Sequence, residues 1–217
     1  MIYLITNQKS AFDTETYSIS TVQDSLDYLD SLRSIALDTE TEGFDPYTDA
    51  IISLQLGNEE RQYVIDISTV DIQLYKEIIE AKLILMQNAK FDLKFLFKHN
   101  IIPGIVYDTF LAERVLSTGL DSVRKNLGAL VHKYCDVLLD KSIVAVIGTE
   151  GLSTRVIQYA ADDVKYLHQI RNKQLITLEE LGLYKTIALD NKYVFVLAYI
   201  EYCGMYLDTA KWKAKCL

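Results

Sequence analysis

Short apolar runs constrain the fold of this chain more than any other feature of its sequence. Residues 34–38, 50–57, 62–67 and 83–87 are rich in Ile, Leu and Val, and each run is too short for a typical helix. The polar turn "NEER" separates the second run from the third, which predicts two strands joined by a hairpin. With a further strand expected at residues 2–5, these runs predict a central sheet.

Helical patterns fill much of the remaining sequence. Apolar residues recur at helical spacing over residues 21–32, and residues 71–81 also follow a helical pattern. Asp108 is expected to cap a further helix, and Ser153 to begin a long one that runs past Ile170. Strands come first, strands then alternate with helices, and helices close the chain, which predicts an α/β fold with a mixed sheet.

Composition and charge exclude several classes of protein. The 217 residues are 50% hydrophobic, which is enough for a substantial core, and the net charge is −8. A protein that coats nucleic acid is usually basic, although metal ions can supply local positive charge in an acidic enzyme. The three cysteines are widely spaced and are expected to be reduced thiols of a cytoplasmic protein. We expect no signal peptide and no membrane span, because no apolar run approaches about 20 residues.

The tetrapeptide DTET occurs twice, at residues 13–16 and at residues 38–41. Two acids one residue apart on a strand project from the same face and can share one metal ion. The second copy follows the apolar residues "IAL", which places Asp38 and Glu40 where a buried strand ends. The first copy follows the polar stretch "NQKSAF", which predicts a solvated loop or turn. The surroundings therefore favour the second copy as the chemical site.

Two further pairs of residues stand in settings that suit the same site. Asn88 follows a predicted strand, and Asp92 comes four residues later in the first turns of a helix. Tyr159 and Asp163 are also four residues apart, so they share one face of a helix. Taken singly, each has a structural interpretation, such as a helix cap for Asn88 or a solvated acid for Asp92. The ordered combination of all three patterns is much more specific.

"LDTETEGFDP", "QNAKFD" and "YAADDV" resemble the three exonuclease motifs of the DEDD superfamily of 3′–5′ exonucleases. Tyr159 places the resemblance in the tyrosine-containing branch, because the histidine branch would have His at that position. The motifs look most like those of the proofreading domain of family A DNA polymerases. The resemblance spans about residues 30–170. The resemblance implies a ribonuclease H-like mixed β-sheet flanked by α-helices.

The chemistry of phosphodiester hydrolysis explains why such motifs are rich in acids. Two divalent ions about 3.5–4 Å apart can activate water and stabilise both the phosphate and the leaving oxygen. Hard oxygen ligands suit Mg²⁺ or Mn²⁺, and carboxylates without metal would repel one another. The resemblance implies that Asp38 bridges both ions and that Tyr159 orients the attacking water. The predicted metal ligands are Asp38, Glu40, Asp92 and Asp163.

Several neighbouring residues match positions that contact the substrate in the family. Phe44 matches a hydrophobic residue that wedges against the terminal base, with turn packing as the alternative. Gln87 and Asn88 match a pair that holds the substrate strand, while Lys90 and Arg155 are candidate phosphate contacts. An exposed lysine is the alternative for Lys90. The full set of predicted substrate contacts is Thr41, Phe44, Gln87, Asn88, Lys90 and Arg155.

The C-terminal segment resembles the junction between exonuclease and polymerase domains in family A enzymes. Residues 1–185 are therefore predicted to form the exonuclease domain, and residues 186–217 the linker and the truncated start of a polymerase domain. The pattern there predicts a helix, a turn at Gly204, a short strand and another helix. A polymerase domain is expected in cis if the chain is a fragment, or in trans if the enzyme is split. The resemblance suggests a compact, phage-type polymerase as the source. Residues 187–207 should then expose apolar surface.

Three functions remain open at this point. The leading interpretation is a two-metal-ion 3′–5′ exonuclease that acts on the single-stranded 3′ end of DNA. An RNase D-like exoribonuclease would share the motifs, and "LLDKS" at residues 138–142 resembles a stretch found in both groups. A catalytically silent scaffold domain of a polymerase is the third possibility, although all four acids and the tyrosine are present.

Overall fold

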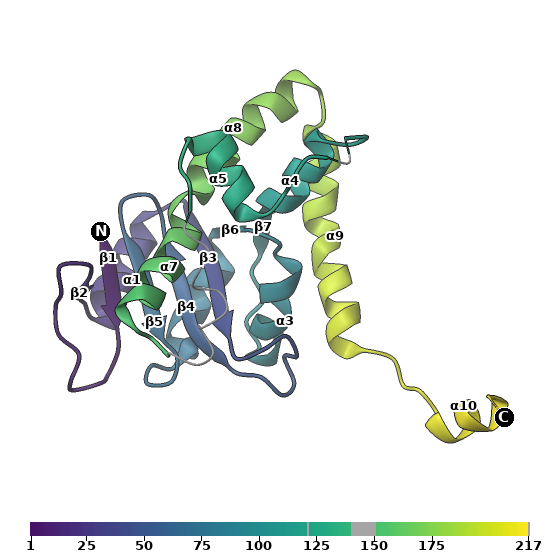
Figure 1. Ribbon diagram of the computed structural model, residues 1–217, viewed down its shortest axis with the longest axis horizontal. Helices are drawn as coiled ribbons and strands as arrows, with labels where there is room; N and C mark the ends of the chain where they lie inside the picture. The colour runs from purple at the N-terminus through teal and green to yellow at the C-terminus, as the bar shows by residue number, and fades with distance from the viewer. Residues whose placement is uncertain (121, 140–150, 217) are drawn as a thin grey trace.

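Residues 1–120, 122–139 and 151–216 are described by a computed structural model of the chain, shown in Figure 1. Within these residues a seven-stranded sheet has the order β2-β1-β5-β4-β3-β6-β7. β4 is antiparallel to both of its neighbours, and the other pairs are parallel, so the predicted mixed sheet is confirmed. The strands are β1 (Ile2–Ile5), β2 (Ser18–Ile19), β3 (Ser34–Thr41), β4 (Ile51–Gly57), β5 (Gln62–Asp66), β6 (Leu83–Met86) and β7 (Ile105–Asp108).

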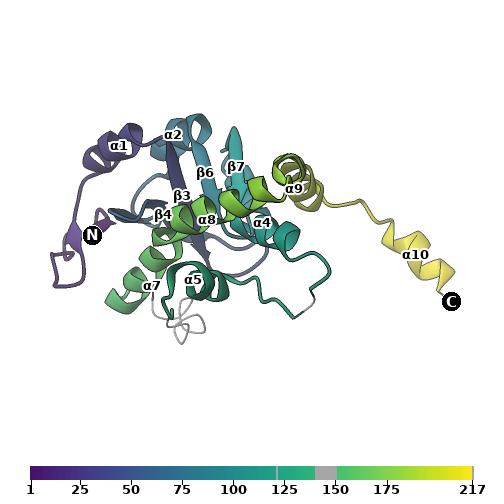
Figure 2. The same cartoon turned by 90° about the horizontal axis from the view of Figure 1, so that it is seen from above.

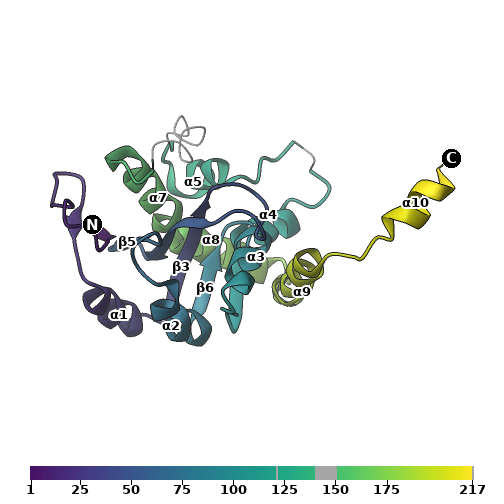
Figure 3. The ribbon, with the colours of Figure 1, turned by 90° about the horizontal axis from the view of Figure 1, so that it is seen from below.

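Helices cover both faces of the sheet, as the views from above and below show (Figures 2 and 3). α1, α2 and α3 bury Leu29, Ile79 and Leu96 in a core on one face. α5, α7 and α8 pack on the other face, and α9 lies beside the β7 edge. The helices are α1 (Val22–Ser31), α2 (Lys76–Ala81), α3 (Lys90–Lys98), α4 (Thr109–Leu116), α5 (Leu127–Cys135), α7 (Thr154–Lys165), α8 (Leu167–Glu180), α9 (Tyr184–Cys203) and α10 (Thr209–Lys215), with a 3₁₀ helix, η1 (Ile72–Tyr75), before α2.

β3 lies inside the sheet between β4 and β6, and its alternation decides which side chains meet which helices. Ala36 packs in the core beneath α8, so Asp38 and Glu40 follow it on the same face. Thr39 faces the opposite side, where α3 packs. A β-bulge between Glu40 and Thr41 ends the regular pairing with β4. Two acids therefore emerge together at the end of a buried strand.

Several local predictions are confirmed by the structure. The turn 58–61 joins β4 to β5 as an antiparallel hairpin, and Asp108 caps α4 by accepting hydrogen bonds from the backbone of Phe110 and Leu111. Ser153 likewise caps the start of α7. The helix predicted over 21–32 is α1.

Two predictions of helix and strand extent are wrong. The long helix from Ser153 is broken at Tyr166, because α7 packs across β3, β4 and β5 whereas α8 turns toward α4, α5 and β6. The strand predicted after Gly204 does not form. Met205 and Tyr206 are both 94% exposed, and no described strand lies beside them to complete a ladder.

The C-terminal helices differ in how they contact the rest of the molecule. α9 packs against α3, α4 and β7, and it buries Ile187, Val194 and Ala198. α10 buries no residue and projects away from the body of the molecule (Figure 1). The domain division predicted at residue 185 falls in the first turn of α9 and stays a prediction. None of the helices described in the structure is long and apolar enough to cross a membrane.

Candidate active site

Three of the predicted metal ligands meet between β3 and α7. Carboxylate oxygens of Asp38, Glu40 and Asp163 all lie within 4.8 Å of one another. Asp163 is buried, with 7% of its surface exposed, and the two acids of β3 are partly buried. Asp38 and Asp163, 125 positions apart in the sequence, thus belong to one cluster because α7 crosses the face of the sheet where β3 ends (Figure 1).

Asp92, the fourth predicted ligand, is held beside this cluster by Thr39. It lies in the first turn of α3 and is only 2% exposed, so it is not a solvated acid. Its Oδ1 accepts hydrogen bonds from the Thr39 backbone N–H at 3.0 Å and from the Thr39 hydroxyl at 2.7 Å. Because Thr39 stands between Asp38 and Glu40 on β3, the strand links Asp92 directly to the three-acid cluster.

Burial, together with the charges of neighbouring acids, raises the pKa values of Glu40 and Asp92. Burial, and after it the charges of Asp163 and Asp92, raise the pKa of Glu40 to about 8. Burial also raises the pKa of Asp92 to about 7, although its hydrogen bonds from Thr39 act to lower it. Without a cation the cluster therefore favours a protonated state near neutral pH.

Tyr159 stands one turn before Asp163 on α7 and is partly buried. Burial raises the pKa of its hydroxyl, and the nearby charges of Asp163 and Glu40 raise it further. A pocket of about 330 Å³ is lined by Tyr159 and Asp163 together with Arg155, which is exposed one turn earlier on the same helix. Thr16, from the first DTET, also lines this pocket. The structure thus brings Arg155 to the site by way of α7.

Thr41 is the last residue of β3, and Phe44 lies in the loop that follows the strand. The Thr41 hydroxyl donates to the Gly43 carbonyl at 2.7 Å, so it shapes the loop. Phe44 is 86% exposed, and its ring meets the ring of Phe91 edge to face at 6.2 Å between centroids. An exposed aromatic ring that is held by a second ring offers a ready stacking surface.

Gln87 and Asn88 connect β6 to α3 and are held by different partners. The Gln87 amide donates to the Lys125 carbonyl at 2.8 Å and accepts from the Thr109 hydroxyl at 2.5 Å, so both its ends are engaged. Asn88 is exposed in a left-handed conformation, and its side chain does not cap α3. Its backbone N–H donates to Asp108 at 3.0 Å. The cap interpretation of Asn88 is therefore wrong.

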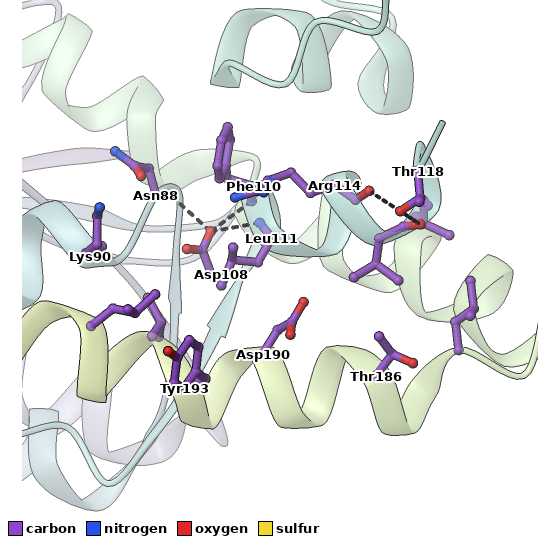
Figure 4. A pocket seen from close by; sticks show the side chains of 15 residues that line it. Asn88, Lys90, Asp108, Phe110, Leu111, Arg114, Thr118, Thr186, Asp190 and Tyr193 are labelled. Carbon is purple, nitrogen blue, oxygen red and sulfur yellow. Dashed lines mark hydrogen bonds between the residues drawn. The ribbon is translucent and has the colours of Figure 1, made fainter. Parts of the chain in front are cut away.

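Lys90 lies at the start of α3 and is tied to α9. Its ammonium group is 2.6 Å from Glu201, and Lys94 binds the other oxygen of the same carboxylate at 3.2 Å. Lys90 and Asn88 also line one end of a groove of about 1030 Å³ between α4 and α9 (Figure 4). None of the four predicted ligands lines this groove, so it is separate from the acidic cluster.

Two buried residues shape the site without having been predicted as part of it. One is Thr39, described above. The other is Asp108, 1% exposed, which accepts backbone hydrogen bonds from Asn88 and Ala89 and so fixes the start of α3. The alternation along β3 could have revealed that Thr39 faces α3, but only the structure shows that Asp108 reaches across to α3.

The acidic cluster fits the divalent metal ions that enzymes of this chemistry use. Its donors are hard carboxylate oxygens close enough together to bind one ion jointly, and burial and the neighbouring acids raise the pKa of Glu40 among them. A divalent cation would remove the repulsion that the buried acids otherwise experience. Asp38, Glu40 and Asp163 would hold it most directly.

Solved structures share the fold of this chain. Brucella melitensis NrnC is 22% identical, with a TM-score of 0.74 and 94% of each chain covered. Escherichia coli RNase D, an exoribonuclease involved in structured RNA processing, is 21% identical with a TM-score of 0.74. That alignment covers 91% of this chain and 51% of RNase D. These likenesses confirm the predicted ribonuclease H-like α/β fold.

Sequence comparisons identify the family. DNA polymerase I of Aquifex aeolicus is 35% identical over 155 residues, which cover 70% of this chain and 25% of the Aquifex protein. The chain thus spans only about a quarter of that relative's length. The family model described as 3′–5′ exonuclease, of the DNA polymerase A type, matches residues 14–178, which include all three predicted motifs. The chain therefore belongs to this 3′–5′ exonuclease family.

Proposed function

We propose that the chain removes nucleotides from the 3′ end of DNA by two-metal-ion hydrolysis, as the proofreading part of a polymerase I-like enzyme. The observation that carries this proposal is the convergence of Asp38, Glu40 and Asp163 within 4.8 Å, beside Tyr159. Such a cluster suits phosphodiester hydrolysis because the reaction builds negative charge that bound divalent cations can offset.

In this proposal each acid has its own task. Two Mg²⁺ or Mn²⁺ ions, when bound, would activate water and stabilise the charge on the phosphate and the leaving oxygen. Asp38, Glu40 and Asp163 would hold these ions directly, and Glu40 and Asp163 would help to hold the one that activates water. Asp92 is fixed by two hydrogen bonds from Thr39 and would act on the second ion or its waters.

Tyr159 is proposed to orient the attacking water and not to remove its proton. Burial and the neighbouring carboxylates keep its pKa above its ordinary value, so the phenol stays protonated at neutral pH. A protonated phenol can both donate and accept a hydrogen bond. It is therefore suited to hold a water molecule in a fixed direction.

The surroundings offer contacts for a nucleotide strand. Phe44 presents an exposed ring in the loop after β3, and this ring could stack on a terminal base. Arg155 lines the pocket that holds Tyr159, and it would contact a phosphate there. Asn88 and Lys90 border the groove between α4 and α9, which supports a role for that groove in guiding the strand (Figure 4). Thr41 and Gln87 would contact the nucleotide strand as well as forming the hydrogen bonds described above.

DNA is proposed as the substrate because the relative that is 35% identical is a DNA polymerase I. The same relationship supports a polymerase domain as partner, in cis or in trans, and a cytoplasmic location. α9 exposes apolar side chains, among them Leu189 (65%), Tyr199 (60%) and Ile200 (56%), which such a domain could cover. RNA is the alternative substrate, since the RNase D fold extends over 91% of this chain.

The test uses 5′-labelled single-stranded DNA and RNA of one sequence, each with Mg²⁺, Mn²⁺ or EDTA. The expected result is a metal-dependent ladder that shortens from the 3′ end of DNA. Asp38→Asn should reduce the rate to below about one hundredth of that of the unsubstituted protein. Asp13→Asn is the matched control, because it makes the same change in the other DTET, and it should leave the rate unchanged.

Each other outcome points to a different function. Faster degradation of RNA than of DNA would assign the chain to exoribonuclease chemistry. No degradation in either metal, by a protein that is folded, would support a silent scaffold and overturn the proposal. Equal loss in Asp38→Asn and Asp13→Asn would show that the cluster on β3 is not the site of hydrolysis.

A further inference from the structure

A buried glutamine on β4 lies next to the acidic cluster and is not accounted for by the chemistry above. Gln55 is 0% exposed and stands directly opposite Asp38 in the antiparallel ladder between β3 and β4. Opposed residues of such a ladder point to the same face of the sheet, about 4.5–5.5 Å apart at Cβ. Gln55 therefore shares the face beneath α7 with the two acids of β3 (Figure 1).

One end of the Gln55 amide is satisfied and the other is not. Its Nε2 donates to the Ser53 hydroxyl at 2.6 Å. Its Oε1 is buried and has no hydrogen-bond partner among the residues that the structure describes. A buried polar atom without a partner destabilises a fold, so such atoms are uncommon and often mark a site for water, an ion or catalysis.

Ser53 extends this arrangement toward the second acid of β3. It is 0% exposed and stands opposite Glu40 on one side and Asp66 on the other. Its oxygen accepts from Gln55, so its own proton must be donated elsewhere. Asp66 already accepts from the side chains of Thr6, Ser68 and Thr69. Glu40 is therefore the better placed acceptor for the Ser53 hydroxyl.

We propose that Gln55 and Ser53 are positioning residues of the metal site. The Ser53 hydroxyl directs a hydrogen bond to Glu40, and the Gln55 amide oxygen accepts one from the hydration water of an ion held by Asp38. This inference rests on the proposed function, because it needs a cation at the acidic cluster. It explains why an amide that is unsatisfied without an ion stands at this position of a buried strand whose other polar side chain is Ser53.

The test measures Mn²⁺ affinity and metal-free thermal stability of the whole chain in parallel. Gln55→Met keeps the length of the side chain and removes the amide. We expect its Mn²⁺ dissociation constant to rise about ten- to a hundredfold, as for other residues that orient metal ligands. Its metal-free melting temperature should stay equal or rise, because an unsatisfied buried oxygen is lost. A purely structural glutamine would not separate these two readouts.

Gln62→Met is the matched control. Gln62 is also a buried glutamine of the same sheet, 2% exposed, but its amide donates to the Asn58 carbonyl at the end of the ladder away from the acids. This variant should melt at a lower temperature and bind Mn²⁺ as tightly as the unsubstituted protein. Ser53→Ala is a second test that still applies if Gln55→Met does not fold, and it should also weaken Mn²⁺ binding.

The outcomes separate this inference from the proposed function. If the unsubstituted chain binds Mn²⁺ and both Gln55→Met and Ser53→Ala bind it equally well, the positioning role is overturned and the metal site stands. If the unsubstituted, folded chain binds no Mn²⁺, both the metal site and the residues proposed to position it are overturned.

Discussion

The two DTET tetrapeptides are identical in sequence and opposite in their use. In the first copy the side chains fold back on their own turn. Asp13 accepts a hydrogen bond from the Ile19 backbone, and the Thr14 hydroxyl accepts from the backbone of Thr16 and Tyr17. Asp13 and Glu15 are both exposed, so the copy is the solvated turn that its polar surroundings predict.

In the second copy the backbone forms hydrogen bonds with neighbouring strands. Its side chains therefore do not fold back on their own backbone and can contact other elements. β4 and β6 flank β3, and Asp38 and Glu40 meet Asp163 from α7. Thr39, the counterpart of Thr14, reaches Asp92 on α3. The comparison teaches that a pair of acids becomes a candidate metal site when a buried strand presents it to a helix that supplies a third acid.

The largest difference in exonuclease rate should appear when the second acid of each copy is replaced by its amide. Glu40→Gln should lower the exonuclease rate to below about one hundredth, because it removes one ligand of the three-acid cluster. Glu15→Gln should leave the rate unchanged, since Glu15 is exposed in the turn. Steady-state degradation of labelled DNA measures both. Equal rates in the two variants would break the distinction between the copies.

A somewhat smaller loss is expected from the tyrosine that faces the second copy. Tyr159→Phe keeps the ring and removes the hydroxyl that would orient water, so the rate should fall by up to about a hundredfold. Tyr17, directly after the first copy, packs its ring against the apolar core beneath α7. Tyr17→Phe is therefore the control, and single-turnover rates of both variants should differ. An unchanged rate in Tyr159→Phe would exclude its role with water.

The pH dependence of stability should also distinguish the two copies. The pKa of Glu40 is raised to about 8 and that of Asp92 to about 7, so the metal-free folded state binds more protons than the unfolded state above pH 4.5. Stability should therefore be highest at low pH within this window and fall as pH rises toward about 8. Melting temperatures in EDTA from pH 5 to 8 test this.

Glu40→Gln should flatten that pH profile, because the variant lacks the acid that resists ionisation, and Glu15→Gln should not. Added Mg²⁺ or Mn²⁺ should abolish most of the fall by stabilising the ionised acids. A melting temperature that rises between pH 5 and 8 in EDTA would show that the buried acids are already ionised and stabilised without metal.

The smallest effects on stability and activity are expected from substitution of the first threonine of each copy, Thr39 or Thr14. Thr39→Val and Thr14→Val each remove a hydroxyl that makes hydrogen bonds, so each should lower the free energy of unfolding by about 1 kcal/mol. Only Thr39→Val should also lower the exonuclease rate, by about tenfold, because it loosens Asp92. Denaturation curves and exonuclease rates, measured for both variants, test this prediction. An equal loss of activity in the two variants would contradict it.

The features that could be predicted from sequence are those with strong local causes. The apolar runs before Asp38 and after the turn at 58–61 predict strands that the structure contains. The four-residue spacing of Tyr159 and Asp163 on one helix was also sufficient to place them together. These patterns depend on side-chain alternation and helical spacing, which a single sequence reveals directly.

The features that could not be predicted depend on distant neighbours. β7 (Ile105–Asp108) is only four residues long and gains its stability from pairing with β6. The break at Tyr166 follows from the different surfaces on which α7 and α8 pack. Asp92 is held by a hydrogen bond from Thr39, which is distant in the sequence. The unsatisfied oxygen of Gln55 on β4 lies next to the acids only because β4 pairs with β3. The segment at 138–142 lies partly outside the described residues, so its resemblance remains a prediction.

The most direct test of the account is anomalous diffraction from crystals of this chain soaked in Mn²⁺. The account predicts anomalous density between the carboxylates of Asp38, Glu40 and Asp163, with none at Asp13 and Glu15. Density at the first DTET, or none between β3 and α7 in crystals that bind Mn²⁺ elsewhere, would contradict it.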